Sequence, residues 1–260
     1  MPSSLHTERL GTGKPLVLVH GLGSSSANWT PVLAPLAATR TVVTFDLPGF
    51  GASLPLAGPV TMVTLTDAVA SFLRDEDLVD ADLVGSSMGA RLVLELARRG
   101  HRGAVVALDP GGFWTPGQAG VFGASVRGSV ALVRALHRAM PALSRSRIGR
   151  TALLYQFSDH PWALDADLVL GELQDFVRAS SFDEALDALV HGPTQAGTSS
   201  PKGRIAIGWG RQDRVTLPSQ ASTALARFPT ATFRGFHRCG HFPHWDQPEQ
   251  TARFILDSTQ

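Results

Sequence analysis

Short apolar runs, several of them rich in β-branched residues, alternate along the chain with longer segments whose apolar residues recur at helical spacing. The runs predict strands at residues 16–20, 41–46, 81–85, 104–109, 204–208 and 231–236. The longer segments predict helices near residues 28–38, 64–77, 88–99, 218–226 and 248–258. This alternation is typical of a mostly parallel sheet flanked by crossover helices, so the predicted fold class is α/β. Only residues 5–13 precede the first of these strands, so an antiparallel edge strand there is expected to be short or missing.

The pattern changes between residues 111 and 202. No strong strand run occurs there, whereas helical stretches fall near residues 124–140, 147–157, 165–179 and 182–190. Because the strand pattern resumes at once afterwards, we interpret this block as an inserted helical cap; the alternative is that its helices merely complete the core. Glycine-containing segments at 111–112 and 192–203 predict hinges. The predicted domains are a core of residues 1–111 and 203–260 and a cap of residues 112–202.

Composition excludes several classes of protein. The chain has 260 residues, 43% of them hydrophobic and 17% charged, which suits one globular α/β domain with an insertion. A net charge of +1 predicts no nucleic-acid or membrane partner. The only cysteine, Cys239, excludes an intrachain disulfide framework and a multi-cysteine metal site. Residues 1–6 lack a signal-peptide pattern, and no run of about 18 apolar residues occurs. We therefore expect a cytoplasmic monomer or homodimer that acts on a small molecule.

Residues 85–89 read Gly-Ser-Ser-Met-Gly and lie between a predicted strand and a predicted helix. This strand–turn–helix context is that of a nucleophile elbow, in which Ser87 adopts a strained backbone and presents its hydroxyl. Gly85 and Gly89 have no Cβ, so strand and helix can pass close to the serine. The Met88 N–H would lie at a helix N-terminus, where negative charge is favoured. The alternative is a glycine- and serine-rich turn without chemistry.

A serine nucleophile needs a base, and the chain offers nine histidines. His241 follows the last predicted strand, in a loop that would lie at the carboxyl end of the sheet, as the elbow does. His237 and His244 are close rivals in sequence. We expect His244 to brace the start of the final helix and His237 to be a surface residue.

The histidine in turn needs a carboxylate partner. Asp213 follows the predicted strand at 204–208, in a turn that contains Gly210 and precedes the apolar Val215. Asp109, at the end of an earlier strand, is the alternative acid. Either aspartate could instead serve as a helix N-cap. We favour Asp213, which gives the order Ser87, Asp213, His241 that serine hydrolases of this layout share.

Backbone amides are needed for the oxyanion of the tetrahedral intermediate. The Met88 N–H is one predicted donor, and the Leu22 N–H is the other, because Gly21 and Gly23 allow their loop to fold back over the elbow. His20 opens this loop and is expected to brace it rather than to transfer protons. Asp46, before a turn rich in proline and glycine, is likewise expected to be structural.

Taken together, these motifs resemble the α/β-hydrolase superfamily, in its serine-nucleophile branch with a small helical cap. The resemblance rests on the following segments, which stand in the family's order and spacing: His20-Gly21-x-Gly23, Asp46-x-Pro48-Gly49-x-Gly51-x-Ser53, Gly85-x-Ser87-x-Gly89, Gly210-x-x-Asp213 and Gly240-His241. It implies the α/β-hydrolase fold and hydrolysis of an ester, thioester, lactone or C–C bond with no cofactor and no metal. Serine at position 87 argues against the branches that use an aspartate nucleophile.

Within that fold, we predict a carboxylesterase-like enzyme that cleaves ester-type bonds of small apolar or aromatic substrates through an acyl-enzyme. The motifs around Ser87, Asp213 and His241 are also similar to those of the meta-cleavage-product hydrolases, which cut C–C bonds and hold a substrate carboxylate with arginine. Ser86 replaces an asparagine that is frequent in that group. The arginines that could bind a carboxylate are Arg138, Arg145, Arg147 and Arg150, although such a run is more often a solvated face. A third hypothesis is a hydrolase-fold receptor with weak turnover.

Overall fold

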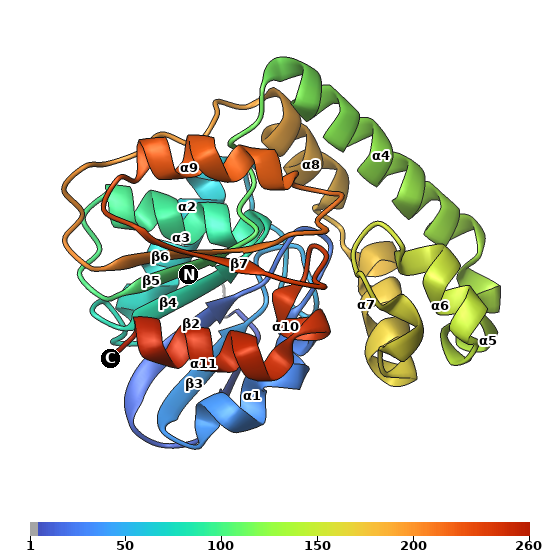
Figure 1. Cartoon of the computed structure of the whole chain (residues 1–260), viewed down its shortest axis with the longest axis horizontal. Coiled ribbons are helices and arrows are strands. Elements are labelled where there is room, and N and C mark those ends of the chain that lie inside the picture. Colours follow the sequence, from blue (N-terminus) through green and yellow to red (C-terminus); the bar gives the residue numbers. More distant parts are fainter. Residues whose placement is uncertain (1–4) are drawn as a thin grey trace.

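A seven-stranded sheet runs through the middle of the computed structural model, which describes residues 5–260 (Figure 1). The strands are β1 (Thr7–Leu10), β2 (Lys14–Val19), β3 (Arg40–Phe45), β4 (Asp82–Ser86), β5 (Val105–Leu108), β6 (Ile205–Gly210) and β7 (Thr232–Phe236). Their order in the sheet is β1-β3-β2-β4-β5-β6-β7, and every pair is parallel except β1 with β3. The predicted α/β class is therefore confirmed. The antiparallel edge strand that was expected to be short or missing is present as the short strand β1. The expectation that residues 1–6 carry no signal peptide falls largely on Met1–Ser4, which lie outside the described residues.

Helices cover both faces of the sheet (Figure 1). One face carries α1 (Thr30–Ala37) and α11 (Pro248–Ser258), and the other carries α2 (Met62–Asp75), α3 (Met88–Arg98) and α9 (Ala221–Arg227). Short 3₁₀ turns, η1 (Ser26–Trp29) and η4 (Pro218–Gln220), lead into α1 and α9.

Burial on both faces explains why the central strands are largely apolar rather than alternating, whereas the edge strands β1 and β7 are more exposed. In β2, Leu16 and Leu18 belong to one buried cluster, and Val17 and Val19 belong to another.

The inserted helices α4–α8 lie together to one side of the sheet (Figure 1). They are α4 (Pro116–Ala135), α5 (Met140–Arg145), α6 (Arg147–Leu154), α7 (Ala166–Arg178) and α8 (Phe182–His191), with 3₁₀ turns η2 (His137–Ala139) and η3 (Pro161–Ala163). The bounds predicted for the helix at 124–140 were wrong at both ends, since α4 begins at Pro116 and ends at Ala135, where the 3₁₀ turn η2 separates it from α5. A local signal for the true start was available, because Thr115 and Gln118 form a capping box.

The apolar core of the inserted helices is continuous with one face of the sheet. Val130, Leu154 and Phe176 belong to the same buried cluster as Val17 of β2 and Leu92 of α3. In the part of the chain that the structure describes, no single helix is long and apolar enough to cross a membrane. Only the bent combination of α4 with the segment His137–Arg145 reaches the required length and composition.

Candidate active site

Ser87 stands at a sharp turn between β4 and α3, with φ 54° and ψ −113°. A non-glycine residue rarely adopts a positive φ, so this backbone is strained as the elbow prediction requires. A Cβ on Gly85 would lie 2.4 Å from the Gly89 carbonyl carbon, and a Cβ on Gly89 would lie 2.2 Å from the Val19 oxygen. Both positions therefore require glycine, because the strand and the helix approach too closely for a side chain.

The two adjacent serines occupy different environments. Ser87 is half-buried, whereas Ser86 ends β4 with a fully buried hydroxyl that lacks a hydrogen-bond partner within residues 5–260. Ser87 is thus the serine with both the strained backbone and access to solvent.

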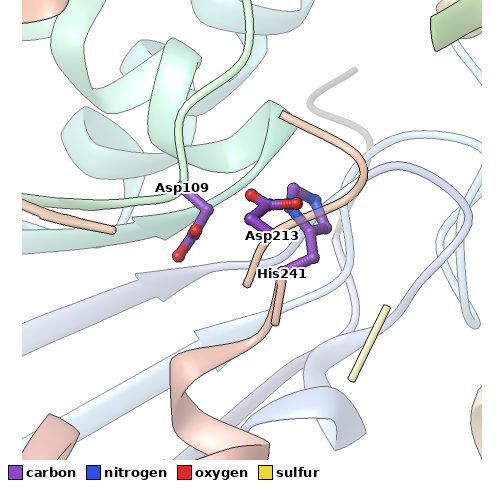
Figure 2. A group of neighbouring side chains, drawn as sticks. All are labelled: Asp109, Asp213 and His241. Carbon is purple, nitrogen blue, oxygen red and sulfur yellow. The ribbon is translucent and has the colours of Figure 1, made fainter. Parts of the chain in front are cut away.

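His241 and Asp213 form a buried pair, with His241 Nδ1 2.9 Å from Asp213 Oδ2 (Figure 2). Their exposed fractions are 1% and 3%. Asp213 also accepts hydrogen bonds from the Val215 amide at 2.7 Å, the Thr216 amide at 3.1 Å and the Thr216 hydroxyl at 2.7 Å. These contacts hold the carboxylate in place and orient the histidine ring, which leaves Nε2 as the nitrogen available for proton transfer.

Within residues 5–260, the Ser87 hydroxyl makes no hydrogen bond, including none to His241. Catalytic hydrogen bonds are often long or misaligned before substrate binds. The structure thus places Asp213 in hydrogen-bond contact with His241 but shows no hydrogen bond between Ser87 and His241 among the described residues.

The loop after β2 lies directly against the elbow. A Cβ on Gly21 would lie 3.2 Å from Ser87 Cβ and 3.8 Å from Ser87 Oγ. Among the described residues, neither the Leu22 N–H nor the Met88 N–H donates a hydrogen bond to a protein acceptor. Two unpaired amides beside a strained serine are what an oxyanion site needs, although their roles stay predictions.

His20 and Asp46 brace this loop, as expected. The ring of His20 contacts the Gly21 oxygen at 2.8 Å through Nδ1 and accepts the Leu47 amide at 2.9 Å through Nε2. Asp46 accepts the Ser26 amide at 2.7 Å through one oxygen and the Ala52 amide at 2.8 Å through the other. Burial lowers the pKa of His20, so its ring stays neutral and suits these two contacts.

The rival histidines lie elsewhere. His237 is exposed at the end of β7. His244 is fully buried in α10 (Pro243–Asp246), where its Nε2 contacts Asn28 Oδ1 and its ring packs 4.5 Å from that of Trp29. Burial lowers the pKa of His244 to about 3, so this residue stays neutral. It braces α10 against the chain before α1.

Asp246 is a supporting residue that the sequence did not single out. Its carboxylate accepts the Ser158 hydroxyl at 2.5 Å, the Asp159 amide at 2.8 Å and the Gly240 amide at 2.7 Å. In addition, the His241 amide donates to the Phe157 oxygen at 2.8 Å. The loop that carries His241 is therefore held by the insertion as well as by the core.

The inserted helix α7 touches the loop after β2 through two acids. Glu172 Oε2 accepts the Ser24 hydroxyl and the side-chain Nδ2 of Asn28, each at 3.0 Å, and Asp175 accepts the Ser25 hydroxyl at 2.6 Å. Burial raises the pKa of Glu172 to about 8, and burial also raises the pKa of Asp175. We call this contact the α7 seam. No local pattern marked it, because the paired residues lie on separate elements.

The arginines considered as carboxylate binders do not point to such a role. Arg138, Arg145 and Arg147 are exposed, and Arg150 donates to the Ser144 oxygen at 2.6 Å and the Trp162 oxygen at 2.8 Å. These contacts are internal to the insertion.

Asp109, the alternative acid, is fully buried beside the pair (Figure 2). One ligand atom from each of Asp109, Asp213 and His241 lies within 4.8 Å of the others, so a metal ion is geometrically conceivable there. Asp213 and His241 already satisfy each other, however, which leaves a single free carboxyl oxygen and makes the trio a poor metal site.

The fold, the elbow and the acid–histidine pair together define a hydrolase of the α/β class. The sequence profile of the alpha/beta hydrolase family matches residues 16–254, and the chain belongs to that family.

Known proteins of several kinds are similar to it. The chain is 31% identical to a 2-hydroxymuconate semialdehyde hydrolase from Pseudomonas sp. (strain CF600), over 94% of this chain and 85% of that protein. It is 30% identical to the dihydrolipoyllysine-residue acetyltransferase component of an acetoin cleaving system from Cupriavidus necator, but spans only 62% of that protein's length. A thermophilic esterase from Thermogutta terrifontis superposes with a TM-score of 0.76 at 21% identity, over 97% of this chain and 92% of that one.

Proposed function

We propose that the protein is a serine hydrolase in which Ser87 is the nucleophile, His241 the general base and Asp213 the acid that orients it. The observation that carries the proposal is the strained, half-buried Ser87 at the carboxyl end of the sheet that also presents the buried His241–Asp213 pair. The function is thus argued from the site, because the fold alone hosts many chemistries.

The proposed reaction has two halves. His241 Nε2 takes the Ser87 proton as Oγ attacks the substrate carbonyl, and the Leu22 and Met88 amides stabilise the oxyanion. Return of that proton to the leaving group yields an acyl-enzyme. Water, deprotonated by the same nitrogen, then releases the acid and restores Ser87. Asp213 stays ionised throughout and stabilises the imidazolium.

Ester-type bonds of small apolar or aromatic substrates are the favoured substrate class. Phe176 and Phe182 pack against Gly23, which is next to Leu22. Trp114 packs against Gly111, whose N–H donates to the main-chain oxygen of Ser87 at 3.4 Å. This apolar surrounding supports an apolar acyl group. We therefore expect an enclosed acyl pocket, which would exclude long-chain lipids.

C–C bond hydrolysis is the second candidate, and the 31% identical 2-hydroxymuconate semialdehyde hydrolase favours it. The exposed or internally bonded arginines of the insertion weigh against it, because a substrate carboxylate would need a cationic partner.

The test compares p-nitrophenyl esters of increasing chain length with a dienone C–C substrate, on wild type, Ser87→Ala and Ser86→Ala. We expect the best kcat/KM on a short or medium ester and a loss of about 10⁴-fold or more in Ser87→Ala. Ser86→Ala is the matched control and should label with a fluorophosphonate as wild type does. Labelling that persists in Ser87→Ala would contradict the proposed nucleophile. A higher kcat/KM on the dienone would favour the second candidate, and one burst without turnover would favour the receptor hypothesis.

A further inference from the structure

Two buried aspartates lie beside His241, but their hydrogen-bond partners differ. Asp213 accepts from two amides and one hydroxyl in addition to its contact with His241. Asp109 accepts only the Gly210 amide, at 2.8 Å on Oδ1, and its Oδ2 has no partner among residues 5–260. A rich set of donors stabilises an ionised carboxylate, whereas a poor set in a buried place stabilises the neutral acid.

The surroundings of Asp109 also disfavour a second negative charge. Asp213 faces it from the turn after β6, His241 and Cys239 from the loop after β7, and Asp246 from α10. Burial, and then the charge of Asp213, raise the pKa of Asp109 well above its usual range. Neither Arg nor Lys is among the groups that act on it, and only the hydrogen bond from the Gly210 amide opposes the rise of its pKa.

The position of Asp109 is held by the backbone as well. The residue directly follows β5 and has φ 47°, a left-handed conformation that is uncommon for non-glycine residues. The Thr216 hydroxyl lies 3.2 Å from the main-chain oxygen of Asp109 and 2.7 Å from Asp213 Oδ2, and its single proton suits the shorter contact. Thr216 therefore lies between the backbone of Asp109 and the carboxylate of Asp213.

We propose that Asp109 is a positioning residue that carries a proton beside Asp213, and that it becomes the acid partner of His241 when Asp213 loses its charge. The inference rests on the proposed function, since it assumes that His241 acts as the base. In the wild type, the neutral Asp109 keeps the buried trio at a single negative charge. Without the Asp213 charge, Asp109 releases its proton to solvent and its carboxylate stabilises the imidazolium in turn.

The experiment measures ester hydrolysis against pH for Asp109→Asn, Asp213→Asn and the double variant, with Ser87→Ala as the baseline. Asparagine keeps the shape of either side chain, and at position 109 its Oδ1 can still accept the Gly210 amide. Asp109→Asn should lose far less activity than Asp213→Asn, because it replaces a neutral acid by a neutral amide. Asp213→Asn should lose less than the roughly 10⁴-fold typical of a missing triad acid. The double variant should lose at least about tenfold more, and the rate ratio of Asp213→Asn to the double variant should rise with pH.

Two outcomes would overturn the inference. One is a double variant equal to Asp213→Asn at every pH; the other is Asp109→Asn as damaging as Asp213→Asn. A readout besides activity is the infrared C=O stretch of a protonated carboxylic acid, recorded in a Glu172→Gln background because Glu172 also carries a proton at neutral pH. A band should be present in this background and lost when Asp109→Asn is added; its absence from the background counts against the proposal. If Ser87→Ala still hydrolysed esters, the proposed function would fail instead, so the two failures are distinguishable.

Discussion

Asp213 and Glu172 are both buried acids close to the predicted catalytic serine, but they belong to regions built on different principles. Asp213, in the turn after β6, is surrounded by backbone and hydroxyl donors and by His241. Glu172, in the α7 seam, has two neutral donors on one oxygen and none on the other among the described residues. The first arrangement holds the carboxylate with several donors, whereas burial with few donors raises the pKa of Glu172 and favours its protonated form.

The comparison separates the proposed catalytic groups from the contact that makes stability depend on pH. The acid–histidine pair is a property of the sheet's carboxyl end and depends on the core. The α7 seam joins the insertion to the loop that carries Leu22, and its charge changes near neutral pH. Substitutions in the two regions should therefore differ in kind: loss of the His241 ring at the sheet end should remove activity at every pH, whereas substitutions at the seam should change how stability depends on pH.

The largest effect is expected for His241→Ala, which should lower kcat by about 10⁴-fold or more because Ser87 loses its base. His237→Ala, on the exposed end of β7, is the matched control and should retain wild-type kcat. Steady-state kinetics on a p-nitrophenyl ester measures both variants. Equal losses in the two would mean that the base has been misassigned.

Gly23→Val should have the next largest effect. A Cβ there would lie 2.3 Å from a Phe176 ring carbon, on a backbone with φ +77°. The loop must move, which would displace the Leu22 amide, and we expect kcat to fall about 10²-fold or more with a smaller change in KM. The control is Gly128→Ala in α4, where an added Cβ meets nothing within 4 Å. Unchanged kcat in a stably folded Gly23→Val would remove this loop from the oxyanion site.

Glu172→Gln tests the seam through the pH dependence of stability. The pKa of Glu172 is about 8 in the folded protein against an ordinary 4.5, so its stabilising contribution is complete below pH 4.5 and is lost as pH rises to about 8. Glutamine cannot ionise, so the Tm of the variant minus that of wild type should increase across this window and then level off. Glu184→Gln, an exposed acid of α8, is the control and should show no such trend. A constant difference across the window would mean that Glu172 is ionised in the folded protein.

The smallest effect on activity is expected for His244→Gln, which removes the contact of the ring with Trp29 but touches none of the proposed catalytic groups. We expect kcat within about threefold of wild type and a loss of about 1–3 kcal/mol in the free energy of unfolding. Since the pKa of His244 is about 3 in the folded protein and 6.5 ordinarily, its contribution to stability is lost as pH falls below 6.5. Urea unfolding should therefore show a smaller difference between variant and wild type at pH 5 than at pH 8.

Much of the fold was predictable because its signals are local. Each predicted strand is present with bounds that differ by at most two residues. The central strands were the plainest, since a strand buried on both faces reads as an apolar run whatever its neighbours are. The elbow at Ser87 was equally visible, because two glycines at fixed spacing are required where β4 and α3 approach each other. That Ser87, Asp213 and His241 lie near one another was also predictable, because each follows a parallel strand and the carboxyl ends of parallel strands meet at the same edge of the sheet.

Only the tertiary structure decided which acids and bases meet. The sequence left both Asp109 and Asp213 open as partners of His241, and the hydrogen bond to Asp213 depends on how the turn after β6 packs. The burial of Glu172 against Ser24, 148 residues away in the chain, has no local signature at all. Local periodicity specifies helices and strands. The burial of an acid and the charges around it depend on residues that packing brings together, and this burial and these charges set its protonation.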